Sequence, residues 1–145
     1  MIEAPDIPGA VDVAAWFGYW PSFHDAEVLS ITLDRLNASR VVIHTFEMTR
    51  EVDARGYYVL DKNAIVTFFL EGFLRDQYGI ANTRLEFFNH QNVLSRAIVN
   101  KTAGGYELVL EGCYGVDGVI SAEHIRVEIA PAMPAGGVYQ PLAGN

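Results

Sequence analysis

The chain has 145 residues, a length that fits one domain built around a single hydrophobic core. Half of the residues are hydrophobic and 19% are charged, which excludes an intrinsically disordered chain. The formal net charge of −8 and the pI near 4.8 argue against a protein that tracks nucleic-acid phosphates, because such a protein carries a basic stripe. The acidity fits either simple solubility or an acidic face that meets a basic partner, and composition does not choose between them.

The sequence also bears on the compartment. No apolar run approaches the roughly 20 residues needed to span a bilayer. The N-terminus lacks the basic and apolar regions of a signal peptide. The lone Cys113 excludes an intramolecular disulfide framework and fits a reducing environment, so we interpret it as a small buried core residue. We therefore expect a cytoplasmic protein that does not associate with membranes.

One short helix is predicted over residues 9–18, after an irregular, proline-rich start. Asp12 falls in the first turn, where a carboxylate interacts favourably with the helix dipole. A helix this short does not stand alone, so packing of Trp16 and its neighbours against the sheet must hold it. The residues at helical spacing are Val11, Ala14, Ala15 and Gly18.

The densest local pattern follows the helix. Pro21 disfavours helical geometry at Trp20, so the helix must end before this corner. A polar knot of His24, Asp25 and Glu27 then leads into a strand. Its alternation has a period of two and predicts a core-facing row of Leu29, Ile31 and Leu33.

Strands and turns fill most of the remaining chain. A charged stretch at residues 49–56 fits either a loop or the end of a long edge strand. The strand at 64–73 is apolar on both faces, so we expect it to lie centrally or beneath the helix. Turns are predicted at residues 36–39, 61–63, 89–92, 101–105 and 115–118. Apolar, β-branched and aromatic runs predict strands at residues 29–35, 40–48, 57–60, 64–73, 83–88, 93–100, 106–114 and 119–129.

These elements predict an α+β fold: a mostly antiparallel β-sheet or sandwich of about seven strands with one short N-terminal helix. No helical crossovers separate the strands, which argues against a parallel βαβ arrangement. We expect a single domain over residues 1–130. The Pro-, Gly- and Ala-rich segment 131–145 is expected to be a flexible C-terminal tail.

The polar knot is the first candidate for chemistry. A histidine beside a carboxylate can serve as a general base or a metal ligand. However, adjacent His24 and Asp25 should point in different directions, and their spacing matches no ligand motif. We favour a turn in which Asp25 or Ser22 bonds free backbone amides. No metal or cofactor is expected, because the remaining histidines are isolated on different elements: His44, His90 and His124.

A family resemblance is carried by residues 20–28, WPSFHDAEV, which look like the opening of the immunity protein 50 family of bacterial polymorphic toxin systems. A weaker point is residues 87–94, FFNHQNVL, which are similar to an Asn-Gln-Asn bend late in that family. Together the two segments cover under a quarter of the chain, and the order of elements agrees through Ile129.

The resemblance implies a non-enzymatic protein that binds a cognate toxin domain and blocks it without a cofactor. An acidic inhibitor suits a basic toxin domain. The motif positions carried over as candidate partner-binding residues are Trp20, Phe23, His24 and Asp25. Most aromatics at this corner belong in the core, with an exposed Trp20 as the alternative. Two other functions stay open: a small hydrolase that uses His24 with Asp25, and an adaptor or structural module.

Overall fold

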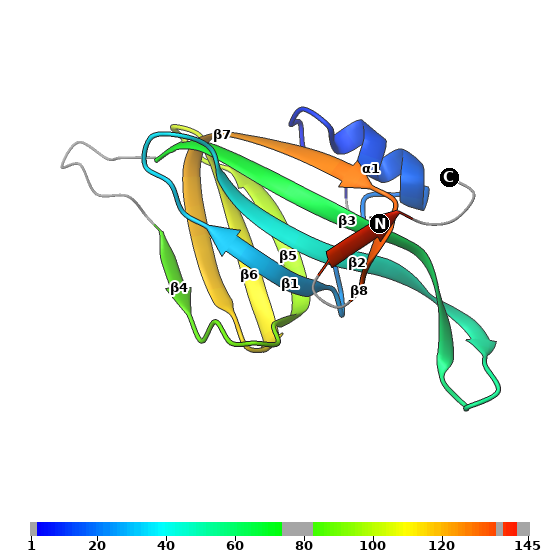
Figure 1. The fold of residues 1–145 in the computed structure, drawn as a ribbon. Helices are drawn as coiled ribbons and strands as arrows, with labels where there is room; N and C mark the ends of the chain where they lie inside the picture. Colours follow the sequence, from blue (N-terminus) through cyan, green and yellow to red (C-terminus); the bar gives the residue numbers. More distant parts are fainter. Residues whose placement is uncertain (1–2, 74–82, 136–137, 142–145) are drawn as a thin grey trace.

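The computed structural model describes residues 3–73, 83–135 and 138–141. Within these residues, seven antiparallel strands form one sheet in the order β3-β2-β1-β5-β6-β7-β4, while β8 and β9 form a separate pair. The α+β fold expected from the sequence is therefore confirmed (Figure 1). The elements are α1 (Ala10–Phe17), β1 (Glu27–Thr32), β2 (Ser39–Val52), β3 (Tyr58–Phe73), β4 (Arg84–Glu86), β5 (Val93–Lys101), β6 (Tyr106–Tyr114), β7 (Asp117–Ala130), β8 (Ala132–Ala135) and β9 (Val138–Pro141).

The large sheet closes on itself. Strand β3 pairs with β2 on one side and with β7 on the other, as its apolar faces predicted. Strand β7 pairs with three strands. Its first half pairs with β4 and β6, and its second half pairs with β3. The join between β1 and β5 has one paired position, Glu27 with Val93. This part of the closure depends on the segment that precedes β1.

The hydrophobic core fills the interior of the closed sheet. Helix α1 packs against β7 and β3 and adds three residues to this core. Within the described part of the chain, no helix has the length and apolar character needed to cross a membrane. The largest fully buried side chains are Phe23, Phe68, Ile43, Leu94, Leu108, Leu110 and Ile120.

Helix α1 lies where the sequence predicted it, but with a different face inward. Gly9 and Gly18 cap it in left-handed conformations, with φ of 89° and 85°. A Cβ on Gly9 would meet the carbonyl oxygen of Val127 at 1.8 Å, so β7 fixes how the helix begins. As a result Val11 is 75% exposed, and the predicted apolar face is wrong. The buried residues are Ala10, Val13 and Phe17.

The inward row predicted for β1 is also wrong. The pairing of β1 with β2 shifts register between Val28 and Ser30, which marks a β-bulge. A bulge inserts one residue and reverses the facing of what precedes it. Val28 is therefore fully buried, while Leu33 beyond the strand is 50% exposed. Ile31 still packs against the core.

Two further local predictions are wrong, the turn at residues 61–63 and the buried Cys113. The turn expected at residues 61–63 is a bulge inside the continuous strand β3, where Lys62 has a φ of 53°. Cys113 is exposed, because it lies near the end of β6, beyond the residues Leu108 and Leu110 that face the core. The undecided stretch 49–56 extends β2 to Val52 and then turns. The segment 131–145, for which a flexible tail was expected, contains the paired strands β8 and β9.

Candidate functional site

The segment between α1 and β1 makes a sharp corner, which we define as Ser22–Ala26. Phe23 and Asp25 have left-handed backbone, with φ of 64° and 63°. This conformation is unfavourable for a side chain as large as phenylalanine, and strain of this kind often marks functional sites. The corner directs the Phe23 side chain into the core, where it is 2% exposed, and the next side chain, His24, outward.

Buried aromatic packing holds the strained corner in place. The rings of Trp20 and Phe23 lie 5.7 Å apart between centroids, and each packs edge-on against Phe68 of β3, at 6.5 and 5.8 Å. Edge-to-face pairs add stabilisation beyond area burial. Trp20 is only 5% exposed, so the alternative of an exposed Trp20 is excluded. The two aromatic motif residues therefore build the corner from within.

The corner also completes the closure of the sheet against β5. Asp25 N–H donates to the Leu94 carbonyl at 2.9 Å, and Leu94 N–H donates to Ala26 at 2.8 Å. Further along β5, Ala97 N–H donates to the Ser22 carbonyl at 3.0 Å. These bonds extend the single paired position between β1 and β5. We call this contact the seam.

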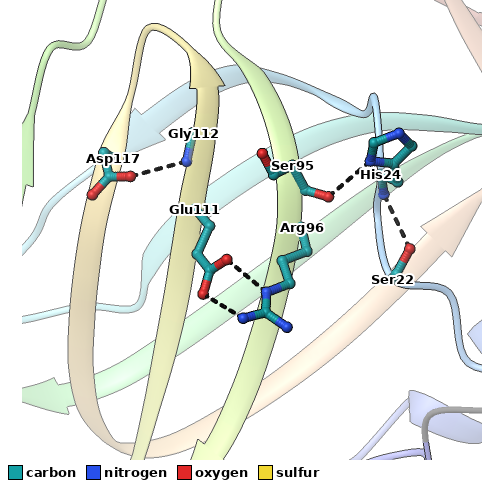
Figure 2. Close-up of polar contacts among 7 residues, drawn as sticks. All are labelled: Ser22, His24, Ser95, Arg96, Glu111, Gly112 and Asp117. Carbon is teal, nitrogen blue, oxygen red and sulfur yellow. Dashed lines mark hydrogen bonds and ion pairs between the residues drawn. The ribbon is translucent and has the colours of Figure 1, made fainter.

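The side chains of His24 and Asp25 lie on the outer side of the seam. His24 Nδ1 is 3.1 Å from the Ser95 carbonyl oxygen, and its backbone N–H donates to Ser22 Oγ at 3.3 Å (Figure 2). The bond predicted from Ser22 is thereby confirmed. His24 Nε2 and Asp25 Oδ2 are 3.5 Å apart, so the two side chains approach each other rather than pointing apart. The histidine side chain is 70% exposed.

A groove of about 330 Å³ separates the corner from β2. Tyr19 Oη donates to Glu47 Oε1 across it at 3.2 Å. Lys62 Nζ lies 3.6 Å from Glu47 Oε2 and also donates to the Phe17 carbonyl at 3.2 Å, at the end of α1. The lining mixes polar and apolar residues: Tyr19, Pro21, Ser22, Phe23, His24, Asp25, Thr45, Phe46, Glu47 and Met48.

The groove alters the ionisation of Tyr19. Burial and the neighbouring Glu47 carboxylate raise the pKa of Tyr19 above its ordinary value of 10.0. The unfolded chain then loses this proton at a lower pH than the folded chain does. The associated stabilisation is thus complete below about pH 10 and is lost as the pH rises through the folded-state pKa. An ultraviolet absorbance titration of the wild type, minus that of Tyr19→Phe, should show this late ionisation. Glu47→Gln should move the midpoint down, and an unchanged midpoint would contradict the assigned role of Glu47.

The second motif segment is a structural hub. The predicted turn at residues 89–92 is confirmed, and its last residue, Asn92, is 2% exposed. Asn92 Oδ1 accepts from Asn89 N–H at 2.9 Å and from Val116 N–H at 3.0 Å, while Nδ2 donates to the Asn89 carbonyl at 2.8 Å. Its backbone carbonyl accepts from Val28 N–H at 2.8 Å. The Asn92 side chain thus ties the bend to the β6–β7 turn, and its backbone carbonyl ties the bend to β1.

The other candidate residues are not brought together. Among the residues that the structure describes, no group of three or more His, Cys, Asp and Glu side chains is placed to hold a metal ion. His44 Nε2 lies 3.0 Å from Asn63 Oδ1, and His90 Nδ1 lies 2.9 Å from Asn89 Oδ1. Each of these two histidines contacts a side-chain amide.

Sequence reasoning missed the groove partners and the surface next to them. Glu47 lies 28 positions from Tyr19 in the sequence, so no local sequence pattern predicts their contact. The ends of β2 and β3 project beyond the rest of the sheet as a hairpin (Figure 1). We call residues 48–60 the arm. Strands were predicted at residues 40–48 and 57–60, but the charged residues of 49–56 left it open whether the two strands continue into a hairpin.

Comparisons with known proteins add no relative. No family model matches the chain, and neither a curated protein nor a solved structure matches it.

Proposed function

We propose that this protein is a cytoplasmic, non-enzymatic inhibitor that binds a cognate toxin domain and neutralises it. The proposal takes the toxin partner from the resemblance of residues 20–28 to the immunity protein 50 family. The observation that carries it is the placement of His24 and Asp25, the two motif residues with outward side chains, on the wall of an open groove of mixed polarity. Protein interfaces combine an apolar centre with a polar rim in this way.

The four motif residues divide into two roles under this proposal. Trp20 and Phe23 are buried, so they act on a partner only by fixing the shape of the corner. His24 and Asp25 are available for direct contact. The net charge of −8 favours a basic toxin domain, because opposite charge accelerates encounter and suppresses wrong partners.

The test is co-expression with whichever polymorphic-toxin domain is encoded beside this gene, followed by co-purification and a growth-rescue assay. A stable complex and restored growth are expected. His24→Ala should weaken protection by no more than a few-fold, since an exposed residue at an interface rim contributes little binding energy. Thermal unfolding of the variant controls for loss of the corner.

Two results would overturn the proposal. One is the absence of a toxin domain encoded beside this gene, or a toxin domain that neither binds nor is neutralised. The other is a His24→Ala protein that still forms the complex but protects no cells, because a hydrolase using His24 with Asp25, 3.5 Å apart, predicts that separation of binding from activity.

A further inference from the structure

The arm stands apart from the hydrophobic core. Strands β2 and β3 pair within the closed sheet up to Thr45 and Ala64, both buried. Beyond this point only the two strands of the arm pair with each other, and no residue of the arm belongs to the core cluster. An isolated two-stranded hairpin is at best marginally stable in water. A surface that covers the arm would therefore stabilise it.

One face of the arm is apolar and exposed. Met48 pairs with Leu60, and Val52 pairs with Tyr58. Residues directly opposite each other in an antiparallel pair project from the same face, so each pair forms a contiguous apolar contact. Their exposures are 51% and 41% for the first pair and 58% and 59% for the second. Contiguous exposed apolar surface of this kind marks an interaction site, and Met and Tyr are among the residues enriched there.

The base of the arm is acidic. Glu47 lies directly opposite Asp61, and like charges in that position repel. Lys62 is 3.6 Å from Glu47 but is also engaged by the Phe17 carbonyl. Asp25 adds a further carboxylate on the same groove. A cationic side chain arriving from a partner would relieve this repulsion.

The negative charge of the chain favours a different protein over a second copy of this chain as the partner that covers the arm. A two-fold symmetric dimer places the same patch of both chains in contact. Two copies meeting through their arms would bring together two Glu47–Asp61 pairs on chains that each carry a net charge of −8. Like-charge juxtaposition across an interface is costly. A basic partner encounters no such penalty.

We propose that the arm and the acidic groove at its base form one continuous docking surface for a partner protein that presents an apolar patch edged by Lys or Arg side chains. Met48 joins the two parts, because it lines the groove and begins the apolar face of the arm. The identity of the partner as a toxin domain rests on the function proposed above. The contribution of the arm to the binding energy is tested separately, with variants of the arm.

The test measures the affinity of the purified protein for the neighbouring toxin domain, inactivated in its catalytic residues, by isothermal titration calorimetry. Two double variants remove the apolar face: Met48→Ser with Leu60→Ser, and Val52→Ser with Tyr58→Ser. Each should bind at least tenfold more weakly, as loss of an interface anchor does. The matched control is Val11→Ser with Leu36→Ser, which removes apolar surface of 75% and 76% exposure elsewhere and should leave affinity unchanged.

The charge component has its own variant, Glu47→Gln with Asp61→Asn. The amide oxygens can still accept the hydrogen bonds from Tyr19 Oη and from Lys62 N–H, so the fold is kept. Binding should weaken and lose part of its salt dependence. Unchanged affinity and an unchanged salt dependence would remove the acidic base from the docking surface.

The outcomes separate the two proposals. A wild-type protein that does not bind the toxin domain overturns the proposed function and this occupant of the arm together. A wild-type protein that binds, with arm variants that bind equally well, overturns only the docking surface. A wild-type dimer in sedimentation that the arm variants dissociate would assign the surface to a second copy and so overturn the proposal.

Discussion

Replacing Phe23 by alanine should lower the free energy of unfolding by about 3–5 kcal/mol, the usual range for removing a buried aromatic ring. Phe23 is 2% exposed, and its ring packs edge-on against Trp20 and Phe68. The substitution leaves a cavity at the centre of this cluster while the left-handed backbone at the site remains. Equilibrium denaturation in urea measures the change.

The chain supplies a matched control for this substitution. Phe87 is also left-handed, with a φ of 61°, but it is 74% exposed. Phe87→Ala should change stability by no more than about 0.5 kcal/mol, as surface substitutions usually do. A Phe23→Ala protein of unchanged stability that no longer binds its partner would show that the motif phenylalanine is a contact residue.

Replacing Asn92 by alanine should cost about 2–4 kcal/mol. The substitution leaves the N–H of Val116 buried without its acceptor and removes both bonds to Asn89. Each buried polar group left unpaired costs about 1–3 kcal/mol. The same denaturation experiment applies, with the unfolding followed by the intrinsic fluorescence of the protein.

Two controls test the cause. Asn100 donates from Nδ2 to Glu107 Oε1 at 3.1 Å on the exposed surface, so Asn100→Ala should change stability by less than about 0.5 kcal/mol. Asn92→Asp keeps an acceptor oxygen for Val116 N–H but loses the Nδ2 donor, and should fall between the wild type and Asn92→Ala. Equal losses for Asn92→Ala and Asn100→Ala would contradict the hub assignment.

Local chemistry explains what could be predicted of the fold. The period of two placed the strands, and the left-handed glycine at position 18 ended the helix where expected. The predictions were wrong where one extra residue in a strand shifted the alternation of inward and outward side chains. The bulge after Val28 reversed the facing of β1, and the bulge at Lys62 looked like a turn. Closure of the sheet depends on which strands pair across long separations, and no local pattern carries that information.

The candidate site could be predicted only in part from the sequence, for the same reason. The corner and its motif could be located from Pro21 and the polar knot. The directions of the side chains could not be predicted. They depend on the left-handed backbone at Phe23 and Asp25, which forms because the core receives the phenylalanine ring. The arm was only partly predicted, because the alternation is weak through residues 49–56 and left both a loop and the end of an edge strand open.

The seam also has a consequence for how the protein folds. His24 contacts Ser95 across a sequence separation of 71 residues, and β3 must meet β7 across a comparable span before the sheet is closed. Each such closure loses chain entropy before the contacts that compensate it can form. The hairpins β2–β3 and β5–β6 are local and can form early, whereas the corner can settle onto β5 only when both are in place. The strained, motif-bearing turn is therefore expected to be the last part of the molecule to order, so a chain that displays a formed corner is one whose folding is complete.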